Sequence, residues 1–309
     1  MSVELLVNVT PSETRVALVE NGLLQEVHVE RQAKRGIVGN IYKGKISRVL
    51  PGMQAAFVDI GLERAAFLHA GDIVKPAQIA AETGDEAPLP PTPNRPITEL
   101  LREGQEIVVQ VVKDPIGSKG ARLTTQISIP SRYLVFLPHS RVLGVSARIE
   151  DEAQRTRLKA LMASLANGSG QGYIVRTNAE GQPDEALAED VAYLRRAWEV
   201  VREASASRKV GQRIYEDLAL PLRAVRDLIR KDVDKVRVDS REAFDKLTAF
   251  ANQFMPDLAE RIEHYAGERP IFDLYGVEDE IQRALQKEVP LKSGGYLVID
   301  QTEAMTTVD

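Results

Sequence analysis

The chain has 309 residues and a mass of 34.2 kDa, enough for one large domain or two to three ordinary ones. Apolar residues make up 43% and charged residues 28%, which excludes a disordered chain, and the absence of cysteine excludes a disulfide scaffold, a cysteine-based zinc site and thiol catalysis. The net charge of −5 argues against indiscriminate coating of nucleic acid, and the lack of a secretory signal or a long apolar run predicts a soluble cytoplasmic protein.

The first thirty residues alternate between apolar and polar side chains in three short runs. Asn21-Gly22 separates the last two runs, and Asn-Gly between such runs is a strong signal for a hairpin turn. The pattern predicts three antiparallel strands.

Residues 36–128 keep a strand-like pattern, interrupted by a proline-rich stretch at 76–96 that indicates a surface insertion. Five short strands with turns between them are typical of an OB-type barrel. The predicted strands are Lys43–Val49, Ala55–Asp59, Ala65–His69, Ile107–Val112 and Arg122–Ile127.

A helical period begins at Glu150, and later segments alternate between helices and short strands. Ser240 is a plausible N-cap for one of these helices. The other predicted elements are a strand at 172–177, helices from 183 to about 201, at 222–229, from 240 to about 253 and at 277–287, and a closing pair of strands at 295–300 and 304–309.

Phe57 and Phe67 occupy equivalent places in two similar segments, ten residues apart around Leu62. A hairpin centred on Leu62 would put the two rings opposite each other on one face. Two interpretations remain open at this point: the rings fill the barrel core, or they stack on bases of a nucleic acid.

Basic residues outnumber acidic ones by seven to three between residues 32 and 75, although the whole chain is acidic. This local excess favours a polyanion site, but a solvated charged face would give the same pattern. The basic residues expected beside the two phenylalanines are Lys43, Lys45, Arg48 and Lys113.

Two further places carry candidate chemistry. Arg176-Thr177 ends a predicted strand, and an arginine fork beside a hydroxyl can hold a terminal phosphate. Asp300, Glu303 and Asp309 lie on the closing hairpin, where carboxylates would suit Mg²⁺, although acidic residues at strand ends are usually just solvated. The four histidines are widely spaced and form no zinc pattern.

Three long strings, at 35–44 (RGIVGNIYKG), 50–61 (LPGMQAAFVDIG) and 303–309 (EAMTTVD), closely resemble the ribonuclease E/G family. The resemblance runs from the first residue to the last. It does not cover the whole catalytic region of that family.

The resemblance implies an α+β multidomain architecture. A ribonuclease H-like subdomain would be split between 1–35 and 216–280, with an OB-type RNA-binding barrel at 36–125 and a 5′-sensor region at 126–215 inserted in it. Residues 281–309 would begin a deoxyribonuclease I-like catalytic domain.

Carried over by position, Phe57, Phe67 and Lys113 resemble the RNA contacts of the family's barrel, with Lys43 and Lys45 beside them. The resemblance therefore favours stacking on bases over the core interpretation.

Arg176 and Thr177 match the family's pocket for a 5′-monophosphate, and Val135 lies at another position of that pocket. One departure concerns Ala147, where some members carry arginine, so the resemblance assigns no role to the neighbouring Arg148.

Asp309 matches the first of two metal-holding aspartates in the family, and the resemblance implies that Asp309 and Glu303, at the two ends of the last string, are catalytic residues. The second aspartate and the family's cysteine motif for zinc are absent from this chain. The resemblance therefore implies Mg²⁺ as the cofactor, held in part by Asp309, and no zinc site.

The leading interpretation is an endoribonuclease that processes and degrades rRNA and mRNA, cleaving single-stranded RNA with Mg²⁺-activated water and preferring a 5′-monophosphate. Its full-length form would be a homo-oligomer, and no membrane partner is expected. The alternative is a catalytically incomplete RNA-binding fragment of that enzyme. A protein-interaction scaffold would leave the basic barrel and Arg176 unexplained.

Overall fold

The computed structural model describes residues 2–73, 95–166, 170–229, 233–291 and 293–309. The chain divides into two compact units, Met1–Arg35 with Ala219–Asp309, and Gly36–Leu218. The proline-rich insertion predicted at 76–96 lies almost entirely outside the described residues. Within the described ranges, no helix is both long enough and apolar enough to cross a membrane.

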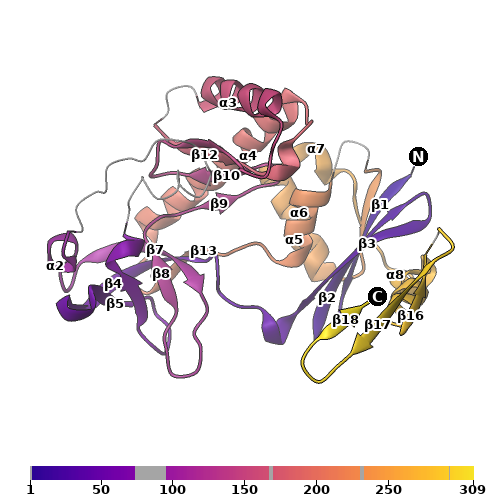
Figure 1. Cartoon of the computed structure of the whole chain (residues 1–309), viewed down its shortest axis with the longest axis horizontal. Coiled ribbons are helices and arrows are strands. Elements are labelled where there is room, and N and C mark those ends of the chain that lie inside the picture. The colour runs from indigo at the N-terminus through magenta and orange to yellow at the C-terminus, as the bar shows by residue number, and fades with distance from the viewer. Residues whose placement is uncertain (1, 74–94, 167–169, 230–232, 292) are drawn as a thin grey trace. The chain divides into compact units, whose positions relative to one another are not determined.

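The first unit contains a five-stranded sheet in the order β15-β14-β1-β2-β3. Its strands β1, β2 and β3 are labelled in Figure 1. The first three strands are antiparallel, as predicted, and Asn21 and Gly22 take the positive φ values of 51° and 78° that their turn requires. Strand β14 pairs with both β1 and β15 in parallel. The strands are β1 (Val3–Val9), β2 (Glu13–Glu20), β3 (Leu23–Arg31), β14 (Lys235–Val238) and β15 (Ile262–His264).

The core of this unit forms around β1, whose residues Leu5, Leu6 and Val7 are completely buried. A central strand covered on both faces reads as a continuous apolar run, which explains the sequence VELLVNV. Ser240 caps the predicted helix α6, since its Oγ accepts a hydrogen bond from the backbone N–H of Ala243 (3.3 Å). The helices are α5 (Leu220–Leu228), α6 (Arg241–Phe254), α7 (Pro256–Ala259), α8 (Ile271–Leu274) and α9 (Val277–Ala284).

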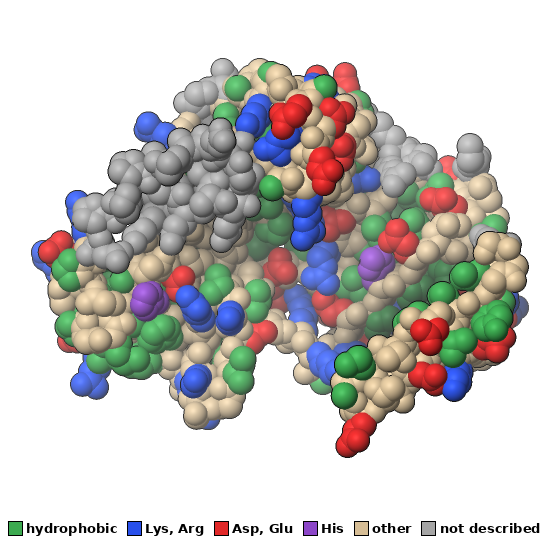
Figure 2. Space-filling view, in the orientation of Figure 1, with side chains coloured by type: hydrophobic (Ala, Val, Ile, Leu, Met, Phe, Trp, Pro, Cys, Tyr) green, Lys and Arg blue, Asp and Glu red, His purple; other side chains and the backbone are tan. Residues whose placement is uncertain are grey.

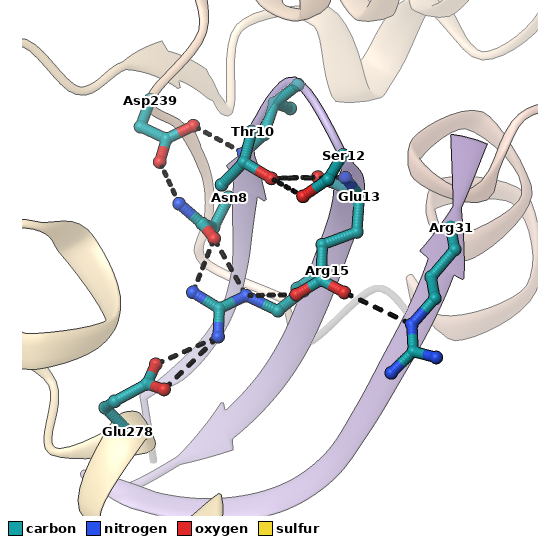
Figure 3. A network of polar contacts seen from close by, with 9 residues as sticks. Asn8, Thr10, Ser12, Glu13, Arg15, Arg31, Asp239 and Glu278 are labelled. Carbon is teal, nitrogen blue, oxygen red and sulfur yellow. Dashed lines mark hydrogen bonds and ion pairs between the residues drawn. The ribbon is translucent and has the colours of Figure 1, made fainter. Parts of the chain in front are cut away.

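A polar network ties α9 to the sheet (Figure 3). Arg15 on β2 donates from Nη1 to both carboxylate oxygens of Glu278 (3.0 and 3.3 Å) and from Nε and Nη2 to the side-chain oxygen of Asn8 (2.9 and 2.7 Å). The Asn8 amide donates in turn to Asp239 Oδ2 (2.6 Å), whose other oxygen accepts from the Val9 N–H (2.9 Å). Asn8 therefore links the end of β1 to the end of β14.

The unit closes with a three-stranded antiparallel sheet of β16 (Glu288–Pro290), β17 (Tyr296–Gln301) and β18 (Thr306–Val308). The last two strands confirm the predicted closing hairpin. The first was not predicted, because a proline within so short a run argues against a strand.

The second unit contains a closed, OB-like barrel of five strands. Antiparallel pairing of β4 with β7 closes it, and β13 (Gln212–Tyr215) pairs with β4 beside it. All five strands match the predicted ones within two residues at the start, and the β8 end falls three residues early. They are β4 (Ile41–Leu50), β5 (Ala55–Asp59), β6 (Ala66–His69), β7 (Glu106–Lys113) and β8 (Arg122–Thr124).

Strand β8 ends at Thr124 rather than at Ile127 because hydrogen bonds of the Thr124 side chain turn the chain. Thr124 Oγ1 accepts from the backbone N–H of Gln126 (3.1 Å) and donates to the carbonyl of Asp72 (2.9 Å). Such local bonds from threonine compete with a strand ladder.

A second sheet, in the order β11-β12-β10-β9, follows the barrel in sequence. Helix α3 (Glu152–Ala166) packs on β11 and β12, and helix α4 (Asp184–Ser207) packs on β10. The strands are β9 (Ile129–Pro130), β10 (Leu134–Leu137), β11 (Leu143–Val145) and β12 (Gly172–Val175). The short remaining helices are α2 (Ile97–Leu100) and 3₁₀ turns at Gln32–Lys34, Pro51–Met53, Ala70–Asp72 and Thr177–Ala179.

Candidate functional site

Phe57 on β5 and Phe67 on β6 are direct cross-strand partners, which confirms the pairing predicted from their symmetry about Leu62. Their ring centroids lie 6.2 Å apart in an edge-to-face arrangement. Both side chains are half-buried, whereas their immediate neighbours on the two strands, Ala56, Val58, Ala66 and Leu68, are buried in the barrel interior. Because side chains alternate along a strand, both rings lie on the outer surface of the barrel.

Basic residues border the pair on both sides. Arg48 on β4 is the cross-strand partner of Phe57, and Arg122 on β8 is the partner of Phe67. Lys113 on β7 is in turn the partner of Arg122, and all three cations are exposed. Figure 2 shows basic side chains interspersed with hydrophobic ones over the barrel strands.

The two remaining predicted cations lie beside acidic residues of neighbouring strands. Lys43 lies with its Nζ 3.4 Å from Glu106 of β7, and Lys45 is the cross-strand partner of both Asp59 and Glu106. The structure therefore brings Arg48 and Lys113 to the phenylalanine pair and leaves Lys43 and Lys45 farther along β4.

Sequence reasoning missed Arg122 as a site residue. The sequence places Arg122 at the start of a predicted strand, but it does not reveal that β8 pairs in parallel with β6, the strand of Phe67. Arg122 is held by Asp72, through bonds from Nε to Oδ2 (3.0 Å) and from Nη2 to Oδ1 (3.3 Å).

Arg176 follows β12, where its backbone N–H donates to the carbonyl of Tyr133 (2.8 Å). Its guanidinium Nη1 donates to the carbonyls of Ser131 (2.6 Å) and Arg132 (3.4 Å). Both bonds come from the same nitrogen, Nη1. The guanidinium as a whole carries five N–H donors on three nitrogens in a fixed fork. Carbonyl oxygens of a tight turn thus set the direction of the side chain.

The other predicted sensor residues lie nearby. Thr177 is exposed, and its hydroxyl is 3.2 Å from the hydroxyl of Ser146. Val135 on β10 is the partner of Ile174 on β12, two residues before Arg176. The structure therefore groups Arg176, Thr177 and Val135 at one end of the second sheet.

Ala147 and Arg148 follow β11 and are both exposed. The backbone N–H of Arg148 donates to Ser146 Oγ (3.4 Å), which is the hydroxyl that lies beside that of Thr177.

Asp190 of α4 is a second residue that sequence reasoning missed. It is only 8% exposed, and its Oδ2 accepts from Ser131 Oγ (2.5 Å) and from the backbone N–H of Tyr133 (2.9 Å). This buried carboxylate fixes the turn whose carbonyls hold Arg176. An acidic residue in a long helix otherwise looks like a solvated one, so the sequence contained no signal for it.

The acidic residues of the closing hairpin do not converge. Glu303 lies in the turn between β17 and β18, while Asp309 follows β18 and exchanges both backbone hydrogen bonds with Val298 (2.8 and 2.9 Å). Asp300 forms an ion pair with Lys287 (2.8 Å), and this partner raises the pKa of Lys287.

Among the described residues, no group of three or more acidic, histidine or cysteine side chains is placed to hold a metal ion. Asp309 and Glu303 are both exposed and lie at opposite ends of β18. Mg²⁺ usually needs one or two carboxylates in fixed positions. Strand β18 therefore separates Asp309 from Glu303 rather than bringing the two residues together.

Comparison with known proteins agrees with these observations. The model of the ribonuclease E/G family matches residues 128–309. Ribonuclease G of Salmonella typhimurium (strain SL1344) is 57% identical over 309 residues, and that of Escherichia coli (strain K12) is 56% identical over 310; in both, the match covers 100% of this chain and 62% of the relative.

Ribonuclease E of Haemophilus influenzae (strain ATCC 51907 / DSM 11121 / KW20 / Rd) is 40% identical over 307 residues, which cover 99% of this chain and 32% of that protein. The spacing of the quoted strings predicts a chain most similar to ribonuclease G, and the higher identities to ribonuclease G confirm this. The chain spans about 62% of the length of those ribonuclease G relatives. With the family model matching more than half of its residues, the chain belongs to the ribonuclease E/G family.

Proposed function

We propose that this chain is an endoribonuclease that cleaves single-stranded RNA with Mg²⁺-activated water and senses a 5′-monophosphate, and that its OB-like barrel binds the RNA. The observation that carries the proposal is the pair Phe57 and Phe67 on the outside of an OB-like barrel, with cations on both sides. Aromatic rings on such a surface stack on bases of any sequence, and the cations bind the phosphates between them.

The family's domain organisation fits the same proposal. The five-stranded sheet of the first unit would be the split ribonuclease H-like subdomain, and β16–β18 would begin the deoxyribonuclease I-like domain. Within the second unit, the barrel would bind RNA and the sheet of β9–β12 would sense the 5′ end. The division of the chain at Arg35 and Ala219 supports an insertion of this kind.

In the sensor, the Arg176 guanidinium would bind a terminal phosphate by charge-assisted hydrogen bonds, and the Thr177 hydroxyl would contribute one more. Val135 would contact the terminal nucleotide. The turn at 131–133, which fixes Arg176, supports this assignment, because a preorganised arginine loses less entropy on binding.

Processing and decay of rRNA and mRNA would be the role of the whole enzyme, with Mg²⁺ activating the attacking water. We assign Asp309 and Glu303 to that catalytic region, as metal-holding and supporting residue respectively. A second candidate, an RNA-binding fragment without activity of its own, is favoured by the separation of these two residues across β18.

Stacking can be tested by measuring the affinity for single-stranded RNA by fluorescence anisotropy. Phe57→Ala and Phe67→Ala should each weaken binding by about 1–3 kcal/mol. Leu23→Ala, which shortens an exposed apolar side chain outside the barrel, is the matched control and should leave the affinity unchanged. Unchanged affinity in both phenylalanine variants would refute the stacking assignment.

The 5′-end sensor needs three RNAs that differ only in a 5′-monophosphate, hydroxyl or triphosphate. We expect the monophosphate to bind most tightly and the three affinities to converge in Arg176→Ala. Arg202→Ala, at an exposed arginine of α4, should keep the difference. Equal affinities in the unmutated chain would remove the sensor assignment.

One incubation distinguishes the two candidate functions. The purified chain is mixed with a 5′-monophosphorylated, AU-rich RNA and Mg²⁺, and internal cuts are sought on a gel. Cutting that disappears in Asp309→Asn would establish the nuclease, whereas binding without cutting would establish the RNA-binding fragment.

A further inference from the structure

Two β-bulges flank the phenylalanine pair, one on each side. Strand β4 pairs Ile46 with Val58 of β5, and the next pair is Arg48 with Phe57, so Ser47 is an extra residue. The Ser47 hydroxyl donates to the carbonyl of Phe57 (3.1 Å).

This bulge decides which way Arg48 points. In a regular ladder Ser47 would oppose Phe57, and Arg48 would oppose Ala56, which is buried in the barrel. Because side chains alternate along a strand, Arg48 would then point into the barrel interior. The bulge instead keeps Ile46 inside and brings Arg48 out beside Phe57.

The second bulge does the same for Lys113. Strand β7 pairs Val111 with Leu123 of β8 and then Lys113 with Arg122, which leaves Val112 as the extra residue. Val111 and Leu123 are buried, while Val112 is 40% exposed. Without the bulge, Lys113 would oppose the buried Ala121.

The two bulges complete one continuous row across the barrel. In strand order β4, β5, β6, β8 and β7, the row reads Arg48, Phe57, Phe67, Arg122 and Lys113. Neighbouring strands are about 4.8 Å apart, so the row is about 19 Å long. Bulges often re-aim side chains near functional sites, and here two separate bulges deliver cations to one line.

Arg122 is fixed within this row by Asp72. The fork of Nε and Nη2 on the two carboxylate oxygens sets the guanidinium plane. Asp72 is itself held, because its carbonyl accepts from Thr124 Oγ1 (2.9 Å) and from the backbone N–H of Thr125 (3.0 Å). An arginine held in this way presents its remaining donors in a constant direction beside Phe67.

We propose that the row is a single track on which RNA crosses the barrel perpendicular to its strands, and that Arg48 and Arg122 bind the phosphates on either side of the stacked bases. The proposal rests on RNA binding by the barrel and adds the path and two phosphate-binding residues to it. Single-stranded RNA fits the row because two rings lie together in it with cations at both ends. A polyanion without bases would not use the rings.

The salt dependence of affinity tests the phosphate contacts. Each phosphate neutralised on a single strand contributes about 0.7 to the slope of log affinity against log salt concentration. The probe is a single-stranded RNA of about 12 nucleotides, within the site size of one OB barrel, with a 5′-hydroxyl that does not engage Arg176.

Arg48→Ala and Arg122→Ala should each reduce the slope by about 0.7. The loss of affinity relative to the unmutated chain should therefore be about 2.6-fold smaller at 200 mM salt than at 50 mM. Arg48→Lys should restore the slope, because the charge is kept. Arg102→Ala, at an exposed arginine outside the row, is the matched control for net charge and should leave the slope unchanged.

Unchanged slopes in Arg48→Ala and Arg122→Ala, with Phe57→Ala still weakening binding, would overturn the track and leave RNA binding by the barrel intact. A slope change of the same size in Arg102→Ala would also overturn it, because charge alone would then explain the effect. Absence of RNA binding by the unmutated chain would instead refute the proposed function.

Discussion

Asp190 offers a stringent test of how the structure orients Arg176. Its carboxylate is buried in α4 and accepts hydrogen bonds from Ser131 Oγ and from the Tyr133 N–H. The Ser131 carbonyl in turn accepts from Arg176. Asp190→Ala should therefore destabilise the second unit and also loosen the guanidinium that is proposed to bind a 5′-monophosphate.

At least two hydrogen bonds are lost, and they set the scale of the effect. A hydrogen bond to a charged group contributes about 1.5–3 kcal/mol, and an unpaired buried donor costs a similar amount. The Ser131 hydroxyl can turn to the carbonyl of Leu134, which lies 3.0 Å away, whereas the Tyr133 N–H loses its acceptor. The loss of one full bond and part of a second should lower the unfolding free energy by about 3 kcal/mol.

Urea unfolding followed by the fluorescence of Trp198, the single tryptophan and a residue of α4, measures this loss. Glu203→Gln, which removes an exposed carboxylate from the same helix, should change the unfolding free energy by no more than about 0.5 kcal/mol.

The same variants are then tested for their preference between 5′-monophosphate and 5′-hydroxyl RNA. Asp190→Asn, which keeps the shape of the side chain, should lower the unfolding free energy less than Asp190→Ala does. It should still reduce the preference for the 5′-monophosphate. A full preference in both Asp190 variants, despite a lower stability, would refute the argument that this carboxylate positions Arg176.

Three smaller tests concern single contacts. Ser240→Ala should lower the unfolding free energy by about 1 kcal/mol through loss of the helix cap, and Ser240→Asp should retain it; equal melting temperatures for all three proteins would contradict the cap. Burial lowers the pKa of His139 below 6.5, so its contribution to stability is present above that value and lost as pH falls. Trp198→Ala, which uncovers the ring, should raise the pKa of His139 in an NMR titration, and an unmoved midpoint would argue against burial as the cause. Asn8→Leu should cost about 2–3 kcal/mol in urea unfolding, because it leaves Asp239 without its amide donor; a loss below about 0.5 kcal/mol would show that the network is dispensable.

Local patterns predicted the strands and helices that carry a clear period. The Asn21-Gly22 turn, the five barrel strands and the cap at Ser240 could all be predicted, because each depends on a few neighbouring residues. The short strands β9–β11 and β13–β16 were not predicted, since two to four residues carry at most a weak period.

The candidate site was predictable only where a local symmetry revealed it. Phe57 and Phe67 could be paired because one hairpin relates them. Arg122 joined them through a parallel pairing across 55 residues of sequence, and Arg48 and Lys113 through bulges that no alternating pattern shows. Asp190 acts through backbone groups of another segment, so its residue type gave no clue.

The central position of β1 has a consequence for the synthesis of the chain. Its antiparallel partner β2 follows at once, but the contact between Val3 and Asp234, next to β14, joins residues 231 positions apart. At a translation rate of about 5–20 residues per second, β14 emerges roughly 10–50 s later. Throughout this interval one edge of a highly apolar strand stays unpaired, which invites association with other nascent chains.

Residues 36–218, in contrast, are all synthesised before β14 and hold the complete barrel with its β13 partner. The inserted unit can therefore finish folding on the ribosome while the unit around it waits for its last strands. A translational pause between codons 218 and 235 would prolong the exposure of β1 and leave the barrel unaffected.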